Sequence, residues 1–378
     1  MDSTPYTNGA ELCIQRHVPP LPFGGVYGPR PRANAPVWQD GEPPDDRVAF
    51  ALDNPPIETL PPSGEDEHTF TITGAKTLRR FGIDDGGAHV LTGYVDRDEA
   101  QVYLAKVYDG VYYPLEDRDT GRDCMLLADY DYAVEARAYD SMHDTEAVVG
   151  KLVPVYYGAW TFCLDTSQPG RRRWVRMLLL ELVHGETMLA KILGATEHDV
   201  VQYPLLPPER FRLGVLKNLF EAEISIWWDA EVLHSDLEPR NVLVRDDGTV
   251  VIIDFNQAFI YRFIHYEQHP KHQEGGPQLP PSPIERYWPF APGEGSLAET
   301  EEDGNAWASW VPQSWLENQD LAAEWLLETW KGASPSKYRP LSKYFLNYPD
   351  HAERGQKVLA ALEQLGRTPA STPPLNKN

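Results

Sequence analysis

The sequence predicts an α+β protein whose β segments are concentrated in the first half and whose helices dominate the second half. At 378 residues the chain exceeds one average domain, so one large domain or two lobes sharing a cleft is expected. Between residues 70 and 183, short β-type segments broken by glycine and acidic turns surround one helical pattern. Before them, residues 1–66 are rich in proline, which removes backbone donors, and we expect a disordered tail.

The charge balance narrows the classes of partner. The chain has 57 acidic and 34 basic residues, a net charge of -23, which opposes attraction to nucleic-acid phosphates and to anionic membranes. Its 3 cysteines show no CxxC spacing, so neither a disulfide framework nor a thiol metal site is expected. The sequence lacks a leader pattern and an apolar run of about 18 residues, which predicts a soluble, cytoplasmic protein. Proline-reading domains could bind residues 19–22, although a solvated extension is the simpler interpretation.

A lysine and a glutamate occupy apolar faces of two consecutive elements. In the predicted strand VYLAKVY, Lys106 shares a face with Leu104 and Tyr108. The next pattern, LADYDYAVEARAYDSM, predicts a helix capped near Asp129 or Asp131, with Glu135 on its apolar stripe. Because an unpaired buried charge is costly, the two side chains could satisfy one another. A snorkelling surface lysine and a solvated glutamate are the alternatives.

Two further strands and a basic cluster follow this helix. The stretches VPVYYGAWTFCLD and RRRWVRMLLLE are β-type, and the second runs into a connection from Glu181 to Gly185 and then a helix. The basic cluster is Arg171 to Arg173 with Arg176. Since it follows the turn signal SQPG, a solvated hairpin tip is favoured over an anion site.

A long helix and a hairpin bring several oxygen-bearing side chains into one region. The segment from Pro207 to Trp227 has a helical apolar period and leads to His234. Beyond it, NVLV and VVIID flank the turn RDDG, which suits a β-hairpin. The fold of this hairpin would gather Asp236, Asn241 and Asp254 at one end. Their oxygens suit Mg²⁺ better than zinc.

The stretch HSDLEPRN at residues 234–241, followed by IIDF at 252–255, resembles the catalytic loop and metal-binding element of the protein-kinase-like superfamily. The nearest likeness is to aminoglycoside and choline phosphotransferase-like enzymes and to fungal atypical kinase-like proteins. The lysine strand, the glutamate helix and the connection LLLELVHG occur upstream in the family's order. The likeness covers roughly residues 70 to 260.

This resemblance implies an ATP site. Lys106 would bind the α- and β-phosphates of ATP, and Glu135 would orient it. Backbone amides of the glycine-containing segment would approach the phosphates, and backbone groups of the connection would bind the adenine edge. These positions are Gly86, Gly87 and Ala88 for the phosphates, and Glu181, Leu182 and Val183 for the adenine.

The resemblance also implies a catalytic and a metal role for the hairpin region. Asp236 would align or accept the proton of the acceptor hydroxyl, and His234 would brace the loop. Asn241 and Asp254 would bind Mg²⁺ that bridges the phosphates. The implied activity is transfer of the γ-phosphoryl group of ATP to a hydroxyl.

Departures from the family pattern favour a small-molecule acceptor. The segment GIDDGGAHV is not a regular glycine loop, and Asn256 stands where a glycine usually follows. Ser235 and Glu238 replace the arginine and lysine that protein serine/threonine kinases carry, which argues against a regulated protein kinase. A protein serine/threonine kinase of atypical type is therefore only the second interpretation. A pseudokinase that acts as a binding or scaffold protein is the third.

The predicted organisation is therefore a two-lobed protein-kinase-like fold. A small β-rich lobe, consisting of a sheet with one helix, spans residues 67–183. A larger, mainly helical lobe spans residues 184–366, and disordered tails span 1–66 and 367–378. Residues 273–304, rich in glycine and proline, are expected to form an irregular insertion near the acceptor site.

Overall fold

The computed structural model describes residues 5–29, 47–57, 67–77, 87–113, 116–117, 122–193, 206–264, 266–287, 307 and 309–341. The chain divides into two compact units. The first comprises Met1–His184 and Asp254–Ile264, and the second comprises Gly185–Ile253 and His265–Asn378. Each unit is described by itself. Three predictions concern residues outside the described ranges. They are those for Gly86, for the part of the insertion after residue 287 and for the tail 367–378.

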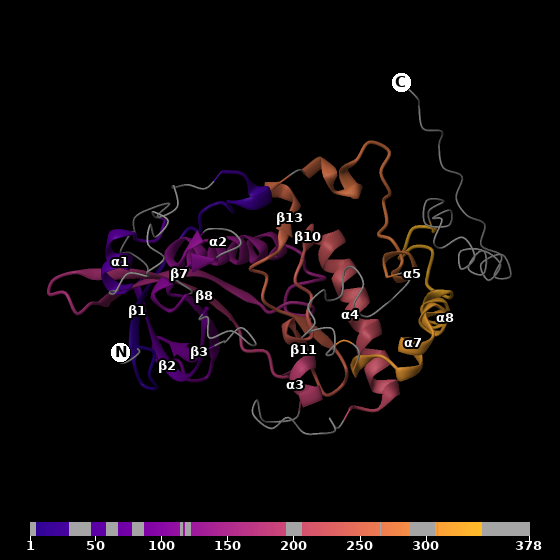
Figure 1. Cartoon of the computed structure of the whole chain (residues 1–378), viewed down its shortest axis with the longest axis horizontal. Coiled ribbons are helices and arrows are strands. Elements are labelled where there is room, and N and C mark those ends of the chain that lie inside the picture. The colour runs from indigo at the N-terminus through magenta and orange to yellow at the C-terminus, as the bar shows by residue number, and fades with distance from the viewer. Residues whose placement is uncertain are drawn as a thin grey trace. The chain divides into compact units, whose positions relative to one another are not determined.

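The first unit is built on a closed six-stranded antiparallel β-barrel with the strand order β1-β2-β3-β4-β8-β7 (Figure 1). The strands are β1 (Glu11–Arg16), β2 (Glu67–Thr77), β3 (His89–Val95), β4 (Tyr103–Tyr108), β7 (Tyr156–Asp165) and β8 (Arg172–Glu181). Alternate side chains of these strands point inward, and Ile14, Phe70, Leu91, Val107 and Met177 are among those that form a fully buried core. This period-2 pattern is the reason that these segments form strands.

The predicted fold class is wrong, because the expected small β-rich lobe and larger helical lobe are not what the structure shows. The first unit is a closed barrel, since β1 pairs with β7 as well as with β2. Closure leaves the sheet without a free edge. The sequence ELCIQR carries the responsible alternation, in which Leu12 and Ile14 are buried.

The predicted disordered tail is wrong for the same stretch of chain. Besides β1, residues 1–66 contain the helix α1 (Arg47–Asp53). Pro19 and Pro20 are buried, and their carbonyl oxygens accept hydrogen bonds from Arg137. Proline excludes regular structure only where it stands, and six consecutive residues without proline are enough for a barrel strand.

Helix α2 (Cys124–Met142) packs beside the barrel (Figure 1). It begins earlier than predicted, because Asp123 accepts hydrogen bonds from the amides of Met125 and Leu126 and is therefore the N-cap. The predicted cap Asp129 lies inside the helix, where its carboxylate accepts a hydrogen bond from the amide of Ile57. The remaining short elements of this unit are β5 (Glu116–Asp117), β6 (Arg122–Asp123) and β13 (Phe259–Ile260).

The basic cluster is only partly the solvated hairpin tip that was predicted. Arg171 and Arg172 are exposed, but Arg173 and Arg176 are buried. Arg173 pairs with the buried carboxylate of Asp109, and Arg176 donates to Thr161 Oγ1. The pattern RRRWVR therefore contains both a turn and the start of a strand whose buried cations have their own partners.

The second unit contains a long helix, a short sheet and a tryptophan-rich helical region. Helix α4 (Glu209–Asp229) confirms the predicted long helix, and β11 (Val242–Val244) pairs with β12 (Val250–Ile252) as the predicted hairpin. Strand β9 (Glu186–Thr187) extends that sheet. The other elements are α3 (Met188–Leu193), β10 (Val232–Leu233), α5 (Pro283–Arg286), α7 (Gln313–Glu317) and α8 (Gln319–Trp330). Trp307, Trp310 and Trp330 are buried in this unit.

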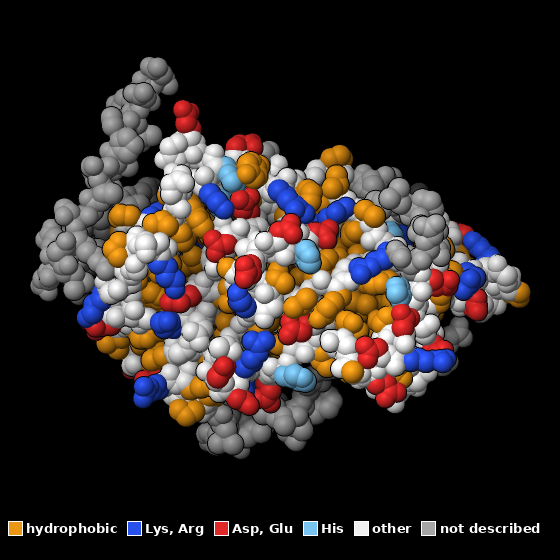
Figure 2. Space-filling view, turned by 180° about the vertical axis from the view of Figure 1, so that it is seen from behind, with side chains coloured by type: hydrophobic (Ala, Val, Ile, Leu, Met, Phe, Trp, Pro, Cys, Tyr) orange, Lys and Arg blue, Asp and Glu red, His pale blue; other side chains and the backbone are white. Residues whose placement is uncertain are grey.

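The surface carries both signs of charge. On the face shown in Figure 2, acidic and basic side chains are interspersed between apolar ones. Within the part of the chain that the structure describes, no helix combines the length and the apolar character needed to cross a membrane.

Candidate functional site

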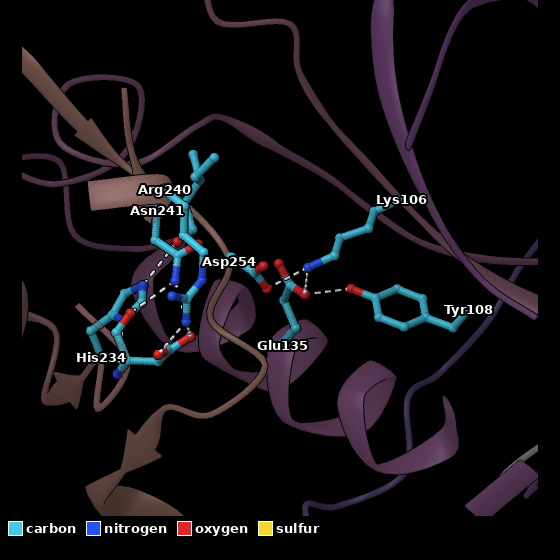
Figure 3. A network of polar contacts seen from close by, with 9 residues as sticks. Lys106, Tyr108, Glu135, His234, Arg240, Asn241 and Asp254 are labelled. Carbon is cyan, nitrogen blue, oxygen red and sulfur yellow. Dashed lines mark hydrogen bonds and ion pairs between the residues drawn. The ribbon is translucent and has the colours of Figure 1, made fainter. Parts of the chain in front are cut away.

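The predicted site residues form two groups, one in each unit. Lys106, Glu135 and Asp254 belong to the first unit, and His234, Asp236 and Asn241 belong to the second. Figure 3 shows the polar contacts within each group.

The first group is centred on the ammonium of Lys106. Because neighbouring side chains on β4 alternate, Ala105 and Val107 enter the barrel core, while Lys106 faces the opposite way. Its Nζ lies 2.5 Å from Glu135 Oε2 and 2.6 Å from Asp254 Oδ1. The hydroxyl of Tyr108, two residues along the same strand, donates to Glu135 Oε2 at 2.6 Å. The ion pair expected between Lys106 and Glu135 is thus confirmed.

Burial and charge act in opposite directions on this group. Burial disfavours the ammonium of Lys106, but the carboxylates of Asp254 and Glu135 outweigh it and raise the pKa of Lys106. Burial raises the pKa of Glu135, and the Lys106 charge only partly offsets this effect. Two acids share one cation here, so Lys106 remains charged, and Glu135, whose side chain is 1% exposed, lies deeper than Asp254 at 27%. With both acids ionised the group has a net charge of about -1, which favours a further cation.

Asp254 is held in a strained backbone conformation. Its φ is 67°, in the left-handed region, and so is that of Ser235 in the second group, at 62°. Such conformations cost of order 1 kcal/mol in residues other than glycine and cluster at functional sites. The rest of the structure therefore holds one residue of each group, Asp254 or Ser235, in an unfavourable backbone conformation.

The second group is organised by the loop that precedes β11. The amide of Asp236 donates to His234 Nδ1 at 3.2 Å, so the proton of this imidazole is on Nε2, which donates to the Ile253 carbonyl at 2.8 Å. Asn241 Nδ2 donates to the carbonyl oxygen of Asp236 at 2.8 Å and to its Oδ2 at 3.0 Å. His234 and Asn241 are buried, so they fix the loop that carries Asp236.

Arg240 is a site residue that the sequence interpretation missed. Its Nη2 lies 2.9 Å from Asp236 Oδ1 and 3.1 Å from Oδ2 (Figure 3). The available signal was the spacing of four residues between an aspartate and an arginine. Arg240 and Asn241 together bind both carboxylate oxygens of Asp236, which fixes the orientation of this side chain.

The structure describes most of the two segments that were expected to bind the nucleotide, Gly87 and Ala88 in the first and Glu181 to Val183 in the second. Gly87 and Ala88 lead directly into β3. In the connection, the amide of Glu181 donates to the Val155 carbonyl at 2.8 Å, and its carboxylate accepts from the Val155 amide at 3.0 Å. The N–H of Glu181 is thus already bonded, whereas Leu182 and Val183 follow the end of β8 and are half-buried.

The residues expected to bind Mg²⁺ supply suitable atoms. Asp254 offers a carboxylate, and the two Nδ2 bonds of Asn241 leave its Oδ1 as the amide atom for a cation. Among the described residues, no three His, Cys, Asp or Glu side chains gather in a way that could hold a metal. Mg²⁺ does not need such a set, because it commonly takes one or two carboxylates together with substrate phosphates and water. Each of the two residues, taken by itself, therefore offers an oxygen atom of the kind that Mg²⁺ binds.

No protein-family model matches the chain, and no curated protein matches it either.

Proposed function

We propose that this protein is an ATP- and Mg²⁺-dependent phosphotransferase that moves the γ-phosphoryl group to a hydroxyl of a small molecule in the cytoplasm. The observation that carries the proposal is the buried ammonium of Lys106, 2.5 Å from Glu135 and 2.6 Å from Asp254. These are the three residues that the motif likeness links, and they come from distant parts of the sequence.

In this proposal Lys106 binds the α- and β-phosphates, and Glu135 and Tyr108 hold its side chain in place. Its ammonium is already desolvated, so it can bind a phosphate with little further loss of hydration. Asp254 and Asn241 would hold Mg²⁺, which supplies positive charge that offsets the phosphates. The backbone of Leu182 and Val183 would bind the adenine edge, and the amides of Gly87 and Ala88 would approach the phosphates.

Asp236 is the residue proposed to orient the acceptor hydroxyl and to take its proton. His234 and Asn241 hold the loop, and Arg240 pairs with the carboxylate of Asp236. Arg240 must release at least one oxygen of Asp236 when the acceptor binds. Its side chain is one-third exposed, which makes such a movement inexpensive.

The same contact supports a second candidate, a pseudokinase that binds partners without turnover. Arg240 and Asn241 together bind both oxygens of Asp236. If Arg240 stays in place, the hydroxyl of an acceptor has no free base. An atypical protein kinase is the remaining alternative within enzymes, distinguished only by the acceptor.

The test is transfer from ATP labelled in its γ-phosphate, with a metabolite extract and with a generic protein as separate acceptors. Transfer to the metabolite fraction is expected, with a requirement for Mg²⁺. Lys106→Met and Asp254→Asn should each lower kcat by at least about 100-fold, equivalent to about 2.7 kcal/mol. Lys331→Met, which removes an exposed lysine of a surface ion pair, is the matched control. Full activity of Asp254→Asn would refute the metal role.

Thermal unfolding with Mg-ATP separates the scaffold from the enzyme. Binding at 100 times Kd stabilises the folded state by about 2.7 kcal/mol. Stabilisation without transfer to either fraction would favour the pseudokinase. Absence of stabilisation at millimolar Mg-ATP would refute the nucleotide site itself.

A further inference from the structure

One mouth of the barrel contains a cavity of about 670 Å³. Its lining comes from the same end of all six strands, together with Asp140 and His143 at the C-terminal end of α2. Arg16 ends β1, His68 is near the start of β2, Val95 ends β3, Tyr103 begins β4, and Leu179 is near the end of β8. The first part of β7 adds Tyr156, Tyr157, Gly158 and Trp160. All of these residues belong to the first unit. Mouths of barrels are a frequent place for small-molecule sites, and this volume is within the usual range of about 300–1,000 Å³.

The cavity is on a different face of the barrel wall from Lys106. Tyr103, Ala105 and Val107 point to the barrel interior, and Lys106 lies between them on the outer face of β4. The mouth is therefore a separate site, and the inference does not depend on the proposed phosphotransferase activity.

Aromatic rings form the wall of the cavity. Tyr103 and Tyr157 pack edge to face, with ring centroids 4.9 Å apart, and Trp160 and His68 do the same at 5.5 Å. Leu179 closes the floor as part of the barrel core. Flat aromatic walls favour a planar apolar ligand, because offset and edge contacts add to the gain from burial.

The backbone of β7 at Gly158 leaves room for Arg16 at this mouth. Its guanidinium lies over the Trp160 ring, 4.0 Å from the centroid, and its Nη1 donates to the Tyr157 carbonyl at 2.7 Å. Gly158 makes this contact feasible: its φ is 102°, and a Cβ there would be 1.8 Å from Arg16 Nη1. The bulge in β7 between Tyr156 and Ala159 provides that conformation.

The charge of Arg16 is not neutralised within the described part of the chain. No carboxylate there lies within ion-pair distance of its guanidinium. The other charged groups at the mouth have partners, since His68 lies 2.5 Å from Asp96, and Asp140 lies 3.0 Å from Arg137. A guanidinium stacked on an aromatic ring, with donors left over, matches a carboxylate.

We propose that the barrel mouth binds a small planar aromatic carboxylate, whose ring lies among Tyr103, Tyr157 and Trp160 and whose carboxylate is bound by Arg16.

The experiment compares 2-naphthoate with its neutral analogue 2-naphthamide on the full chain, by calorimetry or ligand-observed NMR. We expect 2-naphthoate to bind with a Kd below about 1 mM and at least tenfold more tightly than the amide, since a charge-assisted hydrogen bond contributes about 1.5–3 kcal/mol. Arg16→Gln should weaken 2-naphthoate at least tenfold and leave the amide nearly unchanged. Gly158→Ala should act in the same direction, because it displaces Arg16.

Arg172→Gln is the matched control, since Arg172 is an exposed arginine near the far end of β8 and does not line the cavity. The affinity of this variant for 2-naphthoate should equal that of the wild type. Absence of 2-naphthoate binding at millimolar concentration, or equal affinity for the acid and the amide, would overturn the proposal. If Arg16→Gln does not fold, the acid-amide comparison on the wild type decides alone.

Discussion

Replacement of Ile14 by alanine tests whether the N-terminal strand closes the barrel. Ile14 is fully buried in β1, between Phe162 of β7 and His68 of β2 in the strand register. The change removes three carbon atoms, a transfer loss of about 2.4 kcal/mol at about 0.8 kcal/mol per methylene. A residual cavity adds about 1 kcal/mol or more, so the free energy of unfolding should fall by about 3 to 4 kcal/mol.

The measurement is urea unfolding followed by circular dichroism, together with amide hydrogen exchange of β2 and β7. A loss of this size lowers the urea midpoint by about 1 M or more. Leu21→Ala is the matched control, because Leu21 lies in the same N-terminal segment but is 64% exposed. Its loss should stay within about 0.5 kcal/mol. Equal effects of the two changes, with unaltered protection of β2 and β7, would refute the closed barrel.

Three further predictions concern a buried histidine, a pair of glycines and Arg240. Burial, aided by the charges of Arg176 and Arg137, lowers the pKa of His17 to about 3. The unfolded chain therefore binds the extra proton as the pH falls from about 6.5 to 3, and stability should decline in that window by up to about 1.4 kcal/mol per pH unit. In His17→Gln this slope should flatten relative to the wild type and to the control His143→Gln, whose residue is exposed; an unchanged slope would contradict the assignment. A Cβ at Gly93 would lie 2.3 Å from the Thr71 carbonyl oxygen, so Gly93→Ala should lower stability by about 1–3 kcal/mol. Gly214→Ala, in open space within α4, should instead raise stability by about 0.5–1 kcal/mol, and the same sign of the midpoint shift for both glycines would refute this geometry. Arg240→Met should lower the kcat of any phosphotransfer by about tenfold or more, because the Asp236 carboxylate loses the side chain that fixes its position; an unchanged kcat would contradict this role.

The local sequence pattern was sufficient to predict several strands and helices and one ion pair. The alternation in VYLAKVY and the helical period around Glu135 placed a lysine and a glutamate on apolar faces of two elements, and their ion pair is 2.5 Å long. The hairpin around Asp247 and Gly248 was equally readable, since turn chemistry acts over a few residues. These predictions depend only on neighbours in sequence.

What only the tertiary structure decided are the contacts between distant segments. Closure by β1 was hidden, because a six-residue strand among prolines is stabilised by β2 and β7 rather than by its own composition. The burial of Arg173 depends on its ion pair with Asp109. The hydrogen bond from Arg16 to the Tyr157 carbonyl depends on the positive φ of Gly158. Periodicity tells which face of a segment is apolar, whereas the identity of the segment that covers it is settled by packing between segments that are far apart in the chain.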